Sequence, residues 1–313
     1  MSNHALFLTA TLIWGSTWLG ITFQLGVVPP EVSVAYRFAL AAALLAAWCM
    51  WRGVPLRFSR RDHAFLAGTG ATLFGFNYVT VYLAERYVPS GLVAVVFSTI
   101  VFMSPVGMRL VFGAPLSGRT LVAATLGVAG VALMFLPELD AARHGGSAAL
   151  GIAFALVSTA IATAGNLFAV RNHKAGLPTF PATAWGMAYG ALAAALSAAV
   201  TGAAWTFDPR PAYVLSLAYL AVFGSIAAFG AYLTLLKRVG AGPSSFVGVA
   251  TPVVAMLLST LFEGYRWTWV AVLGVVLAVA GNVLALRPAS RTGPGRPPHE
   301  SADATRRSRT TRS

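Results

Sequence analysis

Long apolar runs, separated by short polar gaps, dominate the sequence. A helix that crosses the hydrocarbon core of a bilayer needs about 20 mostly apolar residues. Ten such runs are present, and we expect each to be a membrane-spanning helix. Their approximate ranges are 5–25, 32–51, 64–84, 88–108, 119–136, 149–170, 180–200, 212–236, 243–262 and 267–286. The pattern therefore predicts an all-α integral membrane protein with ten transmembrane helices.

The composition supports this class. The chain has 313 residues, of which 57% are hydrophobic and 10% charged, and its mean hydropathy is +0.73. Soluble domains carry about 25% charged residues. The first apolar run follows only Met1–His4 and has no basic region before it, so we expect a spanning helix and not a cleaved signal. After residue 286 the chain is rich in Pro, Gly, Ser and Arg, which predicts a disordered basic tail, 287–313.

The distribution of basic residues predicts the orientation. Of the 22 Lys and Arg residues, ten lie in loops on one side, seven lie in the tail, and four lie on the opposite side. By the positive-inside rule both termini are cytoplasmic, as an even number of helices requires. The expected location is the bacterial inner (plasma) membrane. Because this placement accounts for the net charge of +13, no nucleic-acid partner is expected.

Residues for metal or nucleotide chemistry are sparse. The single cysteine, Cys49, excludes an internal disulfide and any site with several cysteine ligands. The five histidines lack the spacing of metal ligands, and no Gly-rich phosphate loop is present. We therefore expect no metal, no other cofactor and no ATP-driven pumping by this chain.

The chain also repeats internally. The segment 85–91 resembles 237–243, which divides the protein into five-helix repeats at 5–136 and 149–286. Because five is an odd number, the two repeats must be inserted in opposite senses. Inverted repeats are typical of secondary transporters, whose substrate site lies near the bilayer midplane between the repeats.

Several short motifs resemble those of a known family. They are Trp14-Gly15-Ser16-Thr17, Tyr36-Arg37-Phe38, Val88-Pro89-Ser90-Gly91 and Thr251-Pro252. In their order and spacing, over about residues 5–286, the chain resembles the EamA-type drug/metabolite transporters. The resemblance implies ten helices, a central cavity, and export or exchange of small metabolites, often amino acids or related compounds. In the first repeat, Ile100 stands where a proline is expected, and Gly113 stands in a turn that is acidic in many relatives.

The stretch Trp14-Gly15-Ser16-Thr17-Trp18 is unusual for the middle of a spanning helix. Lipid offers no partner to a hydroxyl, so these residues either pack against another helix or line a substrate path. Hydroxyls or a helix-breaking proline lie at similar depth in three other helices. This coincidence favours the substrate path. The candidate residues of the path are Trp14, Gly15, Ser16, Thr17, Trp18, Arg37, Asn77, Tyr78, Tyr82, Ser98, Thr99, Ser158, Thr159, Trp185, Tyr189, Tyr232, Thr251 and Pro252.

Arg37 is the one cation well inside an apolar run. A charge there is costly and by default marks function, although a long side chain near a helix end can also reach the surface. Glu85 is the best candidate for an ion-pair partner and Glu31 the second; an unpaired Arg37 could bind a substrate carboxylate. No acidic residue falls mid-helix, so we favour facilitated transport or exchange. If protons are coupled, Glu85 and Glu263 are the first candidates.

The leading hypothesis is a secondary transporter, an exporter or exchanger of small metabolites that works by alternating access, and not an enzyme. Its expected partners are a small-molecule substrate and the lipid bilayer. Gly186 and Gly190 have GxxxG spacing, which indicates close packing either within the chain or in a homodimer. The alternatives are a membrane-embedded enzyme acting on lipid or a lipid-linked substrate, and a structural or lipid-interacting protein. The repeat favours transport over both.

Overall fold

Almost every apolar run of the sequence is helical in the computed structural model of the chain. The structure describes residues 1–143, 147–240, 244 and 246–286. Within these ranges it contains helices and connecting turns and no β-strand. The expected all-α class is confirmed. The expected tail, 287–313, lies outside the described residues.

The helices follow the predicted segments to within a few residues at most ends. In chain order they are α1 (Asn3–Thr22), α2 (Pro30–Trp51), α3 (Arg60–Thr69), η1 (Gly70–Phe76), α4 (Asn77–Glu85), α5 (Ser90–Phe97), α6 (Ile100–Phe112), α7 (Gly118–Arg143), α8 (Ala148–Lys174), α9 (Thr179–Thr201), α10 (Pro211–Tyr219), η2 (Leu220–Ala227), α11 (Ala228–Val239), α13 (Phe246–Phe262) and α14 (Trp269–Leu286).

Two of these elements, η1 and η2, are π-helical. Each joins α-helices before and after it into one long segment: α3, η1 and α4 form the first, and α10, η2 and α11 the second. The amide that follows each π-helix bonds to the carbonyl five residues earlier, Asn77 to Thr72 and Ala228 to Phe223. The two elements thus occupy the third helical segment of each predicted repeat.

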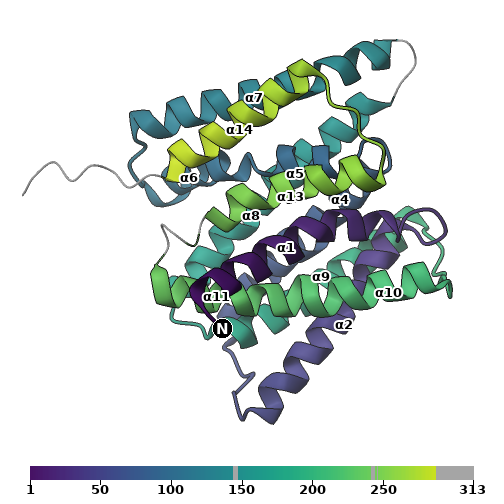
Figure 1. Ribbon diagram of the computed structural model, residues 1–313. Coiled ribbons are helices and arrows are strands. Elements are labelled where there is room, and N and C mark those ends of the chain that lie inside the picture. The colour runs from purple at the N-terminus through teal and green to yellow at the C-terminus, as the bar shows by residue number, and fades with distance from the viewer. Residues whose placement is uncertain (144–146, 241–243, 245, 287–313) are drawn as a thin grey trace, which may run out of the picture.

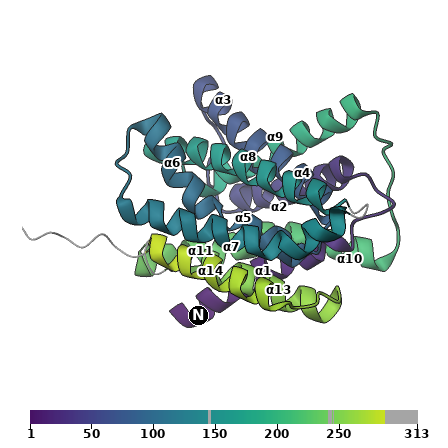
Figure 2. The same ribbon diagram turned by 90° about the horizontal axis from the view of Figure 1, so that it is seen from above.

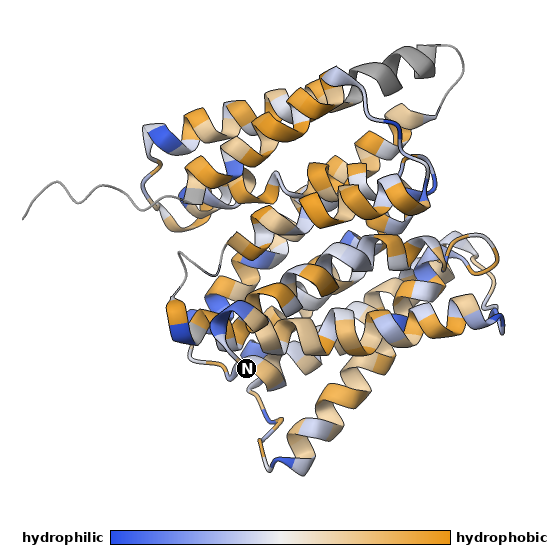
Figure 3. Cartoon of the chain, in the orientation of Figure 1, coloured by the Kyte–Doolittle hydropathy of each residue, from blue (hydrophilic) through white to orange (hydrophobic). Residues whose placement is uncertain are grey.

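The helices suit a bilayer. Within the described residues, seven segments are long and apolar enough to cross a membrane: α1, α2, Arg60–Glu85, Ser90–Phe112, α8, α9 and Pro211–Leu236. Gly118–Met134, Phe246–Phe262 and Trp269–Ala285 are shorter apolar stretches. Figure 3 shows hydrophobic residues along the helices and hydrophilic residues gathered towards the helix ends and the connections. Large apolar side chains such as Trp269 and Val200 face outward, where lipid would surround them. The chain is therefore an integral membrane protein.

Two pairs of long helices flank the centre of the bundle. α7 packs along α14, and α2 packs along α9. In Figure 1 the first pair lies at the top and α2 at the bottom, and Figure 2 shows α7 and α14 side by side from above. Between the pairs, α1 contacts α13 and α11, while α8 contacts α4 and α5. Segments that are far apart in the sequence therefore meet at the centre.

Close helix contacts depend on glycine. A Cβ added at Gly190 of α9 would lie 2.5 Å from the Cβ of Phe74 in η1, and one added at Gly70 would lie 2.4 Å from the carbonyl oxygen of Gly186. The GxxxG pair, Gly186 and Gly190, thus packs within the chain against η1. A similar contact, between Gly130 and Gly274, lets α7 approach α14.

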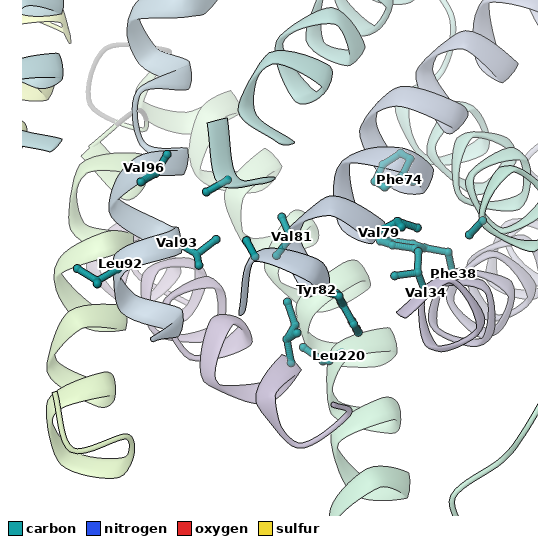
Figure 4. Packing of buried hydrophobic residues seen from close by; sticks show 14 of the residues in the cluster. Val34, Phe38, Phe74, Val79, Val81, Tyr82, Leu92, Val93, Val96 and Leu220 are labelled. Carbon is teal, nitrogen blue, oxygen red and sulfur yellow. The ribbon is translucent and has the colours of Figure 1, made fainter. Parts of the chain in front are cut away.

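The largest buried apolar cluster connects these layers. Figure 4 shows labelled members of it from α2, α4, α5, η1 and η2. Phe38 of α2 lies 5.4 Å from the ring of Phe74 and 4.8 Å from the ring of Tyr78, each measured between ring centroids. This packing holds α2 beside α4 and thereby positions Arg37, the next residue to Phe38, inside the bundle.

Candidate functional site

The stretch Trp14–Trp18 lies where α1 crosses α13 and the segment Pro211–Val239. A Cβ added at Gly15 would lie 2.5 Å from the Cβ of Val254, so α1 and α13 are in direct contact there. On another side of α1, the indole nitrogen of Trp14 donates a 3.2 Å hydrogen bond to the carbonyl of Gly224 in η2. The same indole packs against Tyr232, with ring centroids 5.3 Å apart.

The remaining residues of this stretch also reach neighbouring helices. The hydroxyl of Ser16 is 2.7 Å from that of Tyr219 in α10. Thr17 is buried and donates to the carbonyl of Trp14 at 2.7 Å. Trp18 packs edge-on against Phe97 of α5, with centroids 5.4 Å apart. Packing and polar contact therefore coexist in this stretch.

Most of the candidate hydroxyls bond to their own helices. Thr159 donates to Ala155 and Thr251 to Val247, both at 2.8 Å. Such bonds satisfy the hydroxyl locally and can be exchanged for a ligand without breaking a helix–helix contact.

Ser98 and Thr99 occupy a break in their segment. α5 ends at Phe97 and α6 begins at Ile100, and the two hydroxyls donate to Val95 and Val96, three residues earlier, at 2.7 Å. Pro252, by contrast, lies within the continuous helix α13. The interrupted segment is thus the one in which Ile100 stands where a proline is expected, while the segment that has the proline is continuous.

One hydrogen bond joins the middle of two helices. Ser158 of α8 is fully buried and donates to the side-chain oxygen of Asn77 at 2.8 Å, while the amide nitrogen of Asn77 donates to the carbonyl of Leu73 at 3.1 Å. Asn77 directly follows η1, so this bond ties the π-helical segment to α8. The structure brings these two predicted residues together.

Arg37 is buried, with 1% of its surface exposed. Its guanidinium carbon lies 4.5 Å from the ring centroid of Tyr78 and 5.1 Å from that of Phe38. Among the residues that the structure describes, its Nε and Nη1 atoms have no hydrogen-bond partner, while the side chain also forms a hydrogen bond with the Tyr82 hydroxyl. Aromatic faces stabilise the cation in part, but they do not replace hydrogen-bond acceptors.

Glu85, the expected partner of Arg37, is also buried. In the part of the chain that the structure describes, both of its carboxylate oxygens lack a hydrogen-bond partner. No ion pair within 4.0 Å joins it to Arg37 among the described residues, although the two charges are close enough to interact electrostatically. Between them lies Tyr82, whose hydroxyl donates to the side-chain oxygen of Gln24 at 2.7 Å. We call Gln24, Arg37, Tyr82 and Glu85 the Arg37 cluster.

Glu263, the other candidate for coupling, has a different role in this conformation. Its carboxylate accepts hydrogen bonds from the amide of Ser90, at 3.1 and 3.2 Å, and from the Ser90 hydroxyl, at 2.5 Å. Ser90 is the first residue of α5, where unpaired amides and the helix dipole favour a negative charge. The contact fixes the start of α5 to the end of α13.

Trp185 and Tyr189 of α9 lie away from the Trp14–Trp18 stretch. The Trp185 indole donates to the carbonyl of Leu56 at 2.8 Å, and the Tyr189 hydroxyl lies 3.0 Å from Nδ1 of His63. Trp185 also lines a groove of about 370 Å³ between α2 and α9, whose wall is otherwise alanine and Leu56. These aromatic residues therefore contact the loop after α2 and the start of α3, and they do not lie at the centre of the bundle.

The structure adds three residues that sequence reasoning did not single out. Gln24 and Tyr219 supply the hydrogen-bond partners of Tyr82 and Ser16. Asn282 of α14 is buried beside Ser98 and Pro252 with no partner for its amide. Asn282 and Gln24 had a sequence signal, each as a lone amide in an apolar run, the last and the first respectively.

The all-helical bundle with buried polar residues at its centre defines a polytopic helical membrane protein. The chain matches the EamA-like transporter family over residues 1–136 and 149–287. It therefore belongs to that family, as the motifs predicted.

Named relatives cover most of the chain. The inner membrane transporter YedA of Escherichia coli K12, itself described as uncharacterized, is 30% identical over 290 residues, 87% of this chain and 89% of that protein. A protein of the same organism described as a probable amino-acid metabolite efflux pump is 26% identical over 298 residues, 91% of this chain and 96% of its own. PagO of Salmonella typhimurium is 24% identical over 296 residues.

One solved structure, described only as the crystal structure of a protein, has the same fold. Its TM-score is 0.63 at 20% sequence identity, and the match covers 91% of this chain and 96% of that one. This similarity supports the fold alone.

Proposed function

We propose that the protein is a secondary transporter that exports or exchanges small metabolites, amino acids or related compounds, by alternating access. The observation that carries the proposal is the set of contacts made by Trp14–Trp18 within a chain of the EamA-like transporter family. The stretch contacts α5 of the first predicted repeat and α10, η2, α11 and α13 of the second. The relative described as an amino-acid metabolite efflux pump supports the substrate class.

The proposed architecture is ten transmembrane helices in two inverted repeats, 5–136 and 149–286. A repeated pattern of packing supports it: α1 contacts α13 and α11 as α8 contacts α5 and α4, and η1 packs on α9 as η2 packs on α2. The pairing of α2 with α9 and of α7 with α14 joins equivalent helices. The two π-helices at equivalent places give further support.

We further propose that both termini are cytoplasmic and that the membrane is a bacterial inner membrane. Arg238, one of the basic residues assigned to the inside, donates to the carbonyl of Met1 at 2.9 Å. The N-terminus and the end of α11 are thus on one side. The description of YedA as an inner membrane transporter supports the location.

In this mechanism the midplane hydroxyls exchange partners. Ser98, Thr99, Thr159 and Thr251 would release their own carbonyls and bind substrate when the bundle opens. The aromatic faces of Trp14 and Trp18 would cover apolar parts of the substrate. Opening requires the contacts of α1 with α13 and η2 to slide, while the pairs α2–α9 and α7–α14 stay packed.

Counterflow in liposomes tests the proposal. Purified protein is reconstituted with a high internal concentration of one amino acid or related metabolite, and entry of the labelled compound is followed. We expect transient accumulation for at least one compound, and none in empty liposomes. Absence of exchange for every compound, together with turnover of a lipid, would instead support the membrane-embedded enzyme.

Two substitutions test the path itself. Trp14→Ala and Ser16→Leu should reduce counterflow much more than they reduce the amount of folded protein, because they remove contacts to η2 and α10. Leu12→Ala, at an exposed position of the same helix, is the matched control. Equal loss of transport and of folded protein would assign the stretch to packing alone.

A further inference from the structure

Arg37 and Glu85 are buried in the bundle with opposite charges, and they form no ion pair within 4.0 Å in the described part of the chain. Arg37 is 1% exposed and Glu85 is 7% exposed. Within the described residues, two nitrogens of the guanidinium and both oxygens of the carboxylate have no hydrogen-bond partner. Buried charged groups are ordinarily paired, because water that would stabilise them has been removed. A buried arginine and a buried glutamate that interact electrostatically but form no ion pair among the described residues are therefore unusual.

The spacing of residues along α4 explains why the charges of Arg37 and Glu85 lie along the same face of that helix. Tyr78, Tyr82 and Glu85 lie at positions i, i+4 and i+7 of α4, so they share one face of that helix. Arg37 of α2 lies over the ring of Tyr78. Each residue advances a helix by about 1.5 Å, which places Glu85 roughly two turns further along the same face. The guanidinium and the carboxylate thus flank Tyr82.

Other polar atoms of this region do have hydrogen-bond partners, among them the Tyr82 hydroxyl, which accepts from the Arg37 side chain. The carboxylate of Glu263 is bonded to Ser90. The oxygen of the Gln24 amide accepts from Tyr82, while its nitrogen is buried and has no partner among the described residues. The Arg37 cluster therefore holds three sets of unused atoms: donors on Arg37, a donor on Gln24 and acceptors on Glu85.

We propose that Arg37 and Glu85 bind the head group of a zwitterionic substrate, an inference that rests on the proposed function. The guanidinium binds the substrate carboxylate, for which its planar arrangement of donors is suited. The carboxylate of Glu85 binds the substrate ammonium. The free amide nitrogen of Gln24 donates to the same substrate carboxylate. Each unused atom then gains a partner, which a substrate with only one of the two charges does not provide.

The substrate reaches the Arg37 cluster when alternating access opens this end of the bundle. Gln24 follows the end of α1, Glu85 ends α4, and Ser90 begins α5. The cluster thus lies near the helix ends where the Ser90–Glu263 contact closes the structure. Opening of that contact would expose the cluster and admit the head group.

The test compares one amino acid with analogues that lack either charge. A screen of the standard amino acids selects one that the wild-type protein exchanges. For leucine, for example, the analogues are isoamylamine, without the carboxylate, and 4-methylpentanoate, without the ammonium. Counterflow and the ligand-induced rise in unfolding temperature of the purified protein are both measured. We expect the wild-type protein to prefer leucine over each analogue by about tenfold or more.

The variants separate the two charges. Arg37→Gln should lose the preference over isoamylamine and keep the preference over 4-methylpentanoate, and Glu85→Gln should do the reverse. Arg210→Gln and Glu31→Gln, on the same predicted side of the membrane, should keep both preferences. If Arg37→Gln does not fold, Arg37→Lys retains the charge and should weaken leucine binding about tenfold through loss of the paired donors.

Folded variants that keep both preferences would overturn the assignment and leave the proposed function intact. The same holds if Arg37→Gln and Glu85→Gln lower the unfolding temperature without changing the order of the three ligands. Failure of the wild-type protein to exchange any amino acid or related metabolite would contradict the proposed function instead.

Discussion

The contact between Glu263 and Ser90 should control opening of the bundle at the end where α5 begins. The Glu263 carboxylate accepts from two donors, the amide and the hydroxyl of Ser90. Glu263→Gln keeps the size and one acceptor oxygen but removes the charge. A hydrogen bond to a charged acceptor contributes about 1 kcal/mol more than a neutral one, so two donors give about 2 kcal/mol. This corresponds to roughly a 30-fold shift towards the open conformation.

Cysteine accessibility measures this shift. With the buried Cys49 replaced by Ser, Val93→Cys places a thiol at a fully buried position of α5, three residues after Ser90. A membrane-impermeant maleimide is added to intact cells, and the rate of labelling is followed. Glu263→Gln should raise that rate about 30-fold, the population shift just derived. Glu31→Gln is the matched control.

The result that would refute this reasoning is an unchanged labelling rate in a folded Glu263→Gln protein. The contact would then hold α5 without controlling the opening. A thiol at the exposed Arg86 should react equally in all variants, which checks that the reagent reaches this side.

Two further predictions concern packing and pH. Gly190→Leu should sharply reduce the yield of folded protein in detergent, because its Cβ would lie 2.5 Å from that of Phe74; Gly230→Ala, with open space around it, should be tolerated. The hydrogen bond from the Arg210 side chain lowers the pKa of Asp208 in the loop before α10. A lowered pKa means that the stabilisation is present at neutral pH and is lost as the pH falls through that lowered value. Asp208→Asn should therefore speed hydrogen exchange in 202–210 at pH 7, and the difference from wild type should vanish in strong acid.

The sequence determined the class of the protein. Apolar runs about 20 residues long can be stable only in lipid or a large core, and helices satisfy their own backbone groups there. The all-α fold, the family and the bounds of most helices therefore followed from the pattern of residues. The motif around Trp14 and the choice of Arg37 as a candidate followed for the same reason, since polar groups in such runs stand out, while the burial of Arg37 came from the structure.

The tertiary structure decided which of these residues meet. No local pattern reveals that Ser16 reaches Tyr219 or that Tyr82 reaches Gln24, because such partners are distant in the chain. The π-helices likewise leave no periodic pattern in the sequence. The GxxxG spacing was compatible with packing within the chain or in a homodimer, and the structure shows Gly190 packed against Phe74. Arg37 and Glu85 could be expected to pair from charge alone. That they remain separate, with unused atoms on both, depends on how α2 and α4 pack around Tyr82.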